Sequence, residues 1–83
     1  MPLYMDIHYH IDGLTAAAVA NAHQADLNTQ QKYGAKFLRY WFDESTGKVF
    51  CLIEAPNKEA AIAVHQEAHG LLADELIEVK EGS

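Results

Sequence analysis

Two strand-like segments flank a short turn in the middle of the sequence. Residues 36–43 are rich in aromatic side chains, residues 48–54 are mostly apolar, and the turn DESTG between them ends in Gly47. A glycine-containing turn between two runs that favour β-structure predicts an antiparallel hairpin. Because the chain has only 83 residues, we expect a single domain over 1–83 that contains this hairpin.

The first third of the chain predicts a strand followed by a helix. Apolar and polar side chains alternate over residues 3–10, which is the period of a β-strand with two different faces. Thr15 is a candidate N-cap for an alanine-rich helix that is expected to run to about Tyr33, where Gly34 would stop it.

The last third of the chain predicts a helix followed by a strand. Asn57 precedes an alanine-rich helix expected over 58–69, Gly70 ends it, and a strand is expected over 75–79. The whole chain then reads βαββαβ, an α+β fold of the ferredoxin-like type, with two helices on one face of a four-stranded antiparallel sheet. The other face would expose aromatic residues, so we expect a homodimer through it.

Charge and cysteine content narrow the classes of function. The formal net charge is −6, without clustered cations, which argues against nucleic acid and against an anionic membrane surface and favours cations as partners. The chain has one cysteine, Cys51, and it lacks a signal-like N-terminus and an apolar run near the roughly 20 residues of a membrane span. These features predict a cytoplasmic protein.

Histidine and aspartate recur at spacings that suit a metal ion. In the first strand, Asp6, His8 and His10 point to the same side, because side chains two apart in a strand share a face. Imidazole and carboxylate together can bind nickel, zinc or copper. The first strand therefore offers a row of three candidate ligands.

Each predicted helix adds a pair of candidate ligands. His65 and His69 are four residues apart, and His23 and Asp26 are three apart, so each pair lies on one helix face. The segment from His65 to His69 reads HQEAH, which places its glutamate one residue too late for the HExxH motif of zinc proteases. We therefore expect metal binding rather than proteolysis.

The sequence leaves open whether these ligands form one site or two. The helices should pack side by side and bring their two pairs together. In the first strand, Leu3, Met5 and Ile7 form the more apolar side, which is expected to face the helices. Asp6, His8 and His10 would then lie on the open face, as a separate site at the dimer interface.

Simpler interpretations compete at each position. His10, near a turn, is most simply a solvated side chain, and His65 and His69 can serve as a favourable charge at a helix end. Cys51 lies in the apolar segment VFCLI, where a small core residue is the first interpretation and a thiolate ligand the second.

Four segments of the chain resemble a known family: YMDIHYHIDG, HQADLNTQQKYG, FLRYWFDESTGKVFCLIEAP and VHQEAHGLLADELIEV. They are similar to small bacterial nickel-binding proteins of ferredoxin-like fold, a family formerly known as a domain of unknown function. The resemblance implies a homodimer that binds nickel near the subunit interface and acts in nickel response or sequestration, and it does not imply a catalytic activity. The candidate ligands that it carries over are Asp6, His8, His23, Asp26, His65 and His69.

Three functions are therefore considered. The first is a nickel protein that buffers, sequesters or responds to the metal, with zinc or copper as other candidate ions. The second is a small dimeric enzyme of monooxygenase or isomerase type, in which Trp41, His23 and His65 would line a pocket between sheet and helices. The third is an interaction module whose histidines are incidental.

Overall fold

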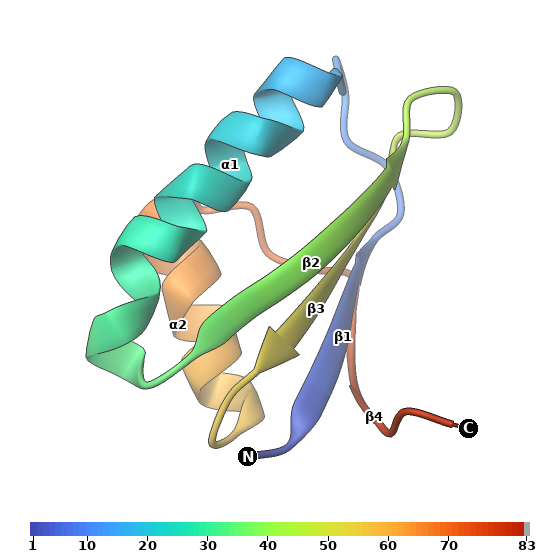
Figure 1. Cartoon of the computed structure of the whole chain (residues 1–83). Helices are drawn as coiled ribbons and strands as arrows, with labels where there is room; N and C mark the ends of the chain where they lie inside the picture. Colours follow the sequence, from blue (N-terminus) through green and yellow to red (C-terminus); the bar gives the residue numbers. More distant parts are fainter. Residues whose placement is uncertain (83) are drawn as a thin grey trace.

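Within residues 1–82, which the computed structural model describes, four strands and two α-helices follow one another in the predicted order βαββαβ (Figure 1). The elements are β1 (Leu3–His8), α1 (Ala16–Thr29), a 3-10 helix η1 (Gln30–Tyr33), β2 (Lys36–Asp43), β3 (Lys48–Glu54), α2 (Lys58–Ala68) and β4 (Glu75–Val79).

Both helices begin at the predicted capping residues. The side chain of Thr15 accepts a hydrogen bond from the backbone N–H of Ala18 at 3.1 Å, and that of Asn57 accepts one from Ala60 at 2.9 Å. Each cap satisfies one of the backbone donors that a helix leaves free at its first turn. The helical segment after Thr15 does continue to Tyr33, but its last turn tightens into η1 before Gly34, at φ 69°, ends it.

The strands form one antiparallel sheet in the order β2-β3-β1-β4. Helices α1 and α2 lie side by side on one face of this sheet (Figure 1). The predicted fold class, an α+β sandwich of the ferredoxin-like type, is therefore confirmed. Ile53 and Val64 lie fully buried between the sheet and α2 and form the centre of the apolar core.

The face of β1 that contacts the helices is the opposite of the one expected. Tyr4, Asp6 and His8 are buried on the helix side, whereas Leu3, Met5 and Ile7 are only partly buried on the other side. The prediction failed because it assigned the polar residues to solvent. In the folded chain the Asp6 carboxylate bonds to His65 of α2, which offsets part of the cost of burying it.

The open face of the sheet is apolar as well. Side chains directly opposite each other in neighbouring antiparallel strands share a face. Ile7 is paired with Phe50, and Phe50 with Trp41, while Met5 is paired with Leu52 and Ile77. Trp41 and Ile77 remain 48% and 44% exposed. We call the surface formed by these residues the open apolar face: Met5, Ile7, Trp41, Phe50, Leu52 and Ile77.

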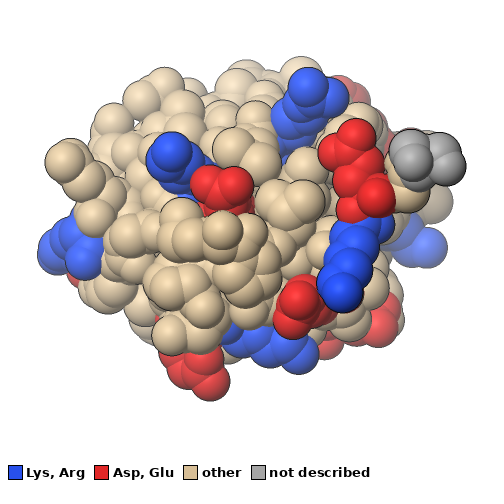
Figure 2. All heavy atoms as spheres, turned by 60° about the horizontal axis from the view of Figure 1, so that its bottom comes forward, with Lys and Arg blue, Asp and Glu red and all other residues tan. Residues whose placement is uncertain are grey.

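Acidic residues outnumber basic ones two to one in the chain, but they are not gathered on every face. On the face shown in Figure 2, acidic and basic residues are interspersed and neither sign forms a continuous patch. Among the described residues, no helix combines the length and the apolar character needed to cross a membrane.

Candidate metal centre

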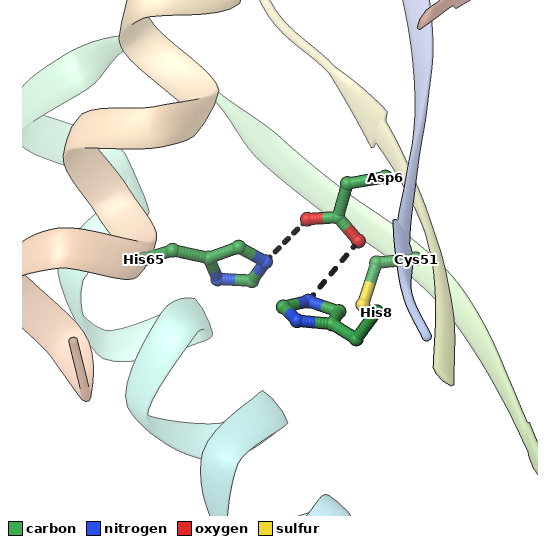
Figure 3. Close-up of side chains that lie close together, drawn as sticks. All are labelled: Asp6, His8, Cys51 and His65. Atoms are coloured by element: carbon green, nitrogen blue, oxygen red, sulfur yellow. Dashed lines mark hydrogen bonds and ion pairs between the residues drawn. The ribbon is translucent and has the colours of Figure 1, made fainter. Parts of the chain in front are cut away.

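Two polar residues of β1 lie buried between the sheet and the helices. Asp6 is 1% exposed and His8 is also buried, and both point from the sheet toward the helices. The register of the sheet places Asp6 directly opposite Cys51 of β3, so the thiol lies beside the carboxylate. Figure 3 shows these three side chains converging with His65 from α2.

His65 connects the strand residues with the helix residues. Its Nε2 lies 2.5 Å from Oδ2 of Asp6, and its Nδ1 lies 2.9 Å from Oδ1 of Asp26 on α1. All three side chains are buried. The imidazole therefore donates to a carboxylate at each of its two nitrogens, and it joins β1, α1 and α2 in one polar cluster.

His69 extends this cluster at the end of α2. Its Nε2 lies 3.0 Å from Oδ1 of Asp26, and its Nδ1 accepts a hydrogen bond of 3.1 Å from the backbone N–H of Leu71. Both ring nitrogens of His69 are thus engaged. The strand residues Asp6 and His8 thus lie in the same region as the helix pairs His65/His69 and His23/Asp26.

Opposite charges stabilise one another within the cluster. Burial alone would raise the pKa values of Asp6 and Asp26. Hydrogen bonds from His65, with further contributions from His8 to Asp6 and from His69 to Asp26, outweigh burial and lower both pKa values, that of Asp6 strongly. Burial alone would lower the pKa of His65, but its bonds to Asp26 and Asp6 outweigh that effect and raise it to about 9. In the absence of another cation, His65 is therefore an imidazolium between two carboxylates.

One oxygen of the cluster lacks a hydrogen bond. Within residues 1–82, Oδ1 of Asp6 is the buried side-chain polar atom without a hydrogen-bond partner. Nε2 of His8 lies 3.5 Å from this oxygen, beyond good hydrogen-bond length. Leaving a buried acceptor unsatisfied costs about 1–3 kcal/mol. The Asp6 carboxylate provides a free acceptor and a negative charge, and the imidazoles of His8 and His65 flank it. These are groups that can bind a transition-metal cation.

Two groups of donor atoms are close enough to hold an ion. The first consists of Asp6, His8, Cys51 and His65, and the second of Asp26, His65 and His69; within each group the donor atoms lie within 4.8 Å of one another. Imidazole, carboxylate and thiolate are ligands of zinc, nickel and copper. The first group thus has the donor chemistry of a transition-metal centre, and so does the second with fewer donors.

A pocket of about 70 Å³ reaches the cluster from the side of α1. Ile11, Leu14 and Ala18 belong to its apolar wall, and its polar end contains His23 along with most of the cluster. At about 30 Å³ per water molecule, it has room for roughly two waters. The pocket gives a small ion or its water ligands a place beside the buried side chains.

Three of the sequence-based expectations are corrected here. His10 lies beyond the end of β1 at His8, so it leaves the row; its side chain is exposed and pairs with Asp12 at 2.7 Å. His23 reaches the pocket but packs against Tyr40 with its ring tilted by 41° and the ring centroids 4.7 Å apart, and it belongs to neither donor group. Asp6 and His8 do not form a separate site on the open apolar face.

Cys51 is the site residue that was absent from the set of expected ligands. A signal for it was present in the sequence, because Val49, Cys51 and Ile53 alternate with Phe50 and Leu52. Once β1 is known to bury Asp6, an antiparallel partner places Cys51 beside it. Sequence alone did not give this register.

The chain matches known proteins over nearly its whole length. A family model described as "Nickel responsive protein SCO4226-like" matches residues 4–79. The crystal structure of SCO4226 from Streptomyces coelicolor A3(2) is similar with a TM-score of 0.90 and 37% sequence identity, over 98% of this chain and 99% of that one. No curated protein matches the chain significantly. The similarity therefore extends from β1 through β4.

Proposed function

Because the chain belongs to the family of nickel responsive SCO4226-like proteins, we propose that it binds a divalent transition metal, nickel first, with zinc and copper as the other candidates. The observation that carries the proposal is the buried Oδ1 of Asp6, which has no hydrogen-bond partner among the described residues and faces His8. A bound cation supplies the partner that this oxygen lacks, and Asp6, His8 and His65 are the ligands we assign.

The second carboxylate has a different role in this proposal. A histidine that binds a metal through one nitrogen usually donates the other N–H to a carboxylate, which fixes its orientation. His65 presents Nε2 to Asp6 and bonds to Asp26 through Nδ1. Asp26 then orients His65, and His69, whose nitrogens are both engaged, supports Asp26 in turn.

The biological role we propose is nickel buffering, sequestration or response. The donor groups are buried, and the adjoining pocket of about 70 Å³ is small for an organic substrate. A bound ion would therefore be held away from solvent rather than presented for reaction. The reducing cytoplasm is the location we propose, since Cys51 is a buried free thiol.

Calorimetric titration of the metal-stripped protein with nickel, and then with zinc, tests this function. We expect saturable binding, weakened at least about tenfold by His8→Gln, which removes a proposed ligand. His10→Ala is the matched control, because His10 is exposed and outside the cluster. If nickel and zinc both give no saturable heat, or if the two variants lose affinity equally, the proposed site is wrong.

The alternative of a small enzyme has less support. His23 and His65 do line the pocket, as that hypothesis expected. Trp41, however, is paired with Phe50 and belongs to the open apolar face, on the other side of the sheet. A pocket of about 70 Å³ without Trp41 offers little to hold an organic substrate.

We also propose that the protein is a homodimer through the open apolar face. Exposed apolar patches on small domains commonly mark interaction surfaces. A second copy would cover Trp41 and Ile77, which are about half exposed in the isolated chain. The metal centre we propose lies on the opposite side of the sheet, so each protomer would hold its own ion.

A further inference from the structure

We infer that Cys51 is a fourth protein ligand and that the metal of this protein is held by a sulfur atom in addition to Asp6, His8 and His65. The inference rests on the proposed function, because it requires that a metal binds. It goes further by assigning the thiolate, and with it the class of ions that the centre selects.

The position of Cys51 is fixed by the middle of the sheet. β3 lies between β2 and β1, and the register places Cys51 between Tyr40 and Asp6. The residue is 7% exposed, and its Sγ lies within 4.8 Å of donor atoms of Asp6, His8 and His65 (Figure 3). A thiol in a central strand is held rigidly, as a metal ligand needs to be.

The surroundings of Cys51 differ from those of its neighbours along β3. Val49 and Ile53 point to the same side and pack in the apolar core. Cys51 belongs to the same core, but it also borders the Asp6 carboxylate and lies near two imidazoles. A cysteine that only fills space does not require such neighbours, whereas a metal ligand needs other ligands around it.

The unsatisfied oxygen of Asp6 is the second, independent observation. Oδ2 of Asp6 is bonded to His65, but Oδ1 is buried without a hydrogen-bond partner among residues 1–82, within the same donor group as the Cys51 thiol. The unsatisfied oxygen and the Cys51 thiol thus meet at one point. A cation at that point would bind both.

The charges of this donor set match a divalent ion. On binding, the Cys51 thiol and Nε2 of His65 each lose a proton to solvent, and the Asp6 carboxylate and the Cys51 thiolate together provide two negative charges. His8 and His65 add neutral nitrogens. Charge balance matters in a buried site, because an uncompensated ion is costly to remove from water. A bound metal ion favours the deprotonated thiol directly.

A sulfur ligand determines which metal ions can compete for the site. Thiolate and imidazole favour nickel, zinc, cobalt and copper, whereas magnesium, calcium and manganese prefer oxygen ligands. We therefore expect millimolar magnesium or calcium neither to bind at this site nor to reduce the binding of nickel or zinc. A site made of Asp6 and imidazoles alone would discriminate less.

Absorption spectroscopy during nickel titration tests the inference. Metal-stripped wild-type protein should develop a sulfur-to-nickel charge-transfer band in the near ultraviolet that saturates at the same equivalence as the calorimetric heat. Cys51→Ser should lack the band and bind nickel at least about tenfold more weakly, as expected for loss of a ligand. Cys51→Ala, which places no oxygen in the site, should behave in the same way, and His10→Ala should retain the band.

A second measurement does not depend on how well a variant folds. X-ray absorption at the nickel edge of the loaded wild-type protein should show a sulfur neighbour. Saturable heat without the band and without a sulfur neighbour would overturn the assignment of Cys51 and leave the proposed function intact. Absence of saturable heat in the wild-type protein would overturn both.

Discussion

His65 is the residue on which the buried cluster depends. Its two nitrogens bond to two carboxylates that come from different elements, Asp6 on β1 and Asp26 on α1. Both carboxylates are buried, so water cannot replace the hydrogen bonds from His65 if that side chain is removed. The same side chain thus stabilises the fold in the absence of metal and, in our proposal, binds the metal when it is present.

Removal of this imidazole should destabilise the metal-free protein strongly. His65→Ala leaves two buried carboxylates without their shared partner, and breaking a buried ion pair costs about 3–5 kcal/mol. We expect a decrease of that order in the free energy of unfolding, measured by urea denaturation at neutral pH. His10→Ala, at an exposed histidine, should change it by no more than about 0.5 kcal/mol. Equal effects of the two variants would contradict the prediction.

The charge of His65 should also make stability depend on pH. Its pKa is raised from 6.5 to about 9 by folding, so the folded state binds the proton more tightly. This contribution is fully present below about pH 6.5 and is lost as the pH rises through 9. We expect the free energy of unfolding of the metal-stripped protein to fall by on the order of 3 kcal/mol across that window.

The control for this pH dependence is His65→Gln, which cannot take up a proton. Its stability should lack the decrease between pH 6.5 and 9. At acid pH the sign is reversed: the pKa values of Asp6 and Asp26 are lowered by folding, so their contribution is present above pH 3.8 and lost as the pH falls through their folded values. A wild-type stability that stays constant from pH 6.5 to 9 would show that His65 is not charged.

At the scale of elements, local sequence signals were sufficient for most of the fold. Thr15 and Asn57 are capping residues whose chemistry acts within three residues, and the structure has both caps. The face of β1 could not be predicted in this way. Alternation separates the side chains of β1 into two sets, but it does not say which set faces the helices. That depends on Asp26 and His65, which lie 20 and 59 residues after Asp6 in the chain.

The same limit applies to the candidate site. The helix pair His65 and His69 was predicted from spacing, and so was the pair of Asp6 and His8 on one face of a strand. That these pairs meet depends on the packing of α1 and α2 over the sheet, and the position of Cys51 depends on strand register. His10 was included because the strand was expected to be two residues longer than it is.

The cap of α2 offers a prediction at this scale, since this helix carries His65. Asn57→Ala removes the acceptor for the N–H of Ala60 and should cost about 1 kcal/mol. For a domain of this size that corresponds to a decrease in melting temperature of about 4–8 °C. Asn57→Asp keeps an acceptor and should melt close to the wild type in a calorimetric scan. A drop with aspartate as large as that with alanine would argue against the cap.

At the scale of the whole molecule, the sheet separates two surfaces with different roles. The helix side holds the polar cluster, and the other side is the open apolar face, with Trp41 and Ile77 about half exposed. In our proposal one side binds the ion and the other binds a second copy. Substitutions on the open apolar face should therefore affect assembly and leave the ligands in place.

Ile77→Glu tests this separation. A charge within the proposed interface should convert the dimer into a monomer, because an unpaired buried charge is costly. Light scattering after size-exclusion chromatography measures the mass. Ile62→Glu is the matched control, since Ile62 on α2 is 45% exposed and Ile77 is 44% exposed. A wild-type protein that is already monomeric, or an Ile77→Glu variant that remains dimeric, would contradict the prediction.

The wide spacing of the cluster along the chain also bears on how the protein is made. Asp6, Asp26, Cys51 and His65 come from β1, α1, β3 and α2, in that order. During synthesis the two carboxylates and the thiol exist well before the imidazole that joins them. In our proposal, a growing chain therefore lacks the complete set of ligands until His65 has been added and the chain has folded. The amount of metal held would then follow the number of completed chains rather than the rate at which synthesis begins.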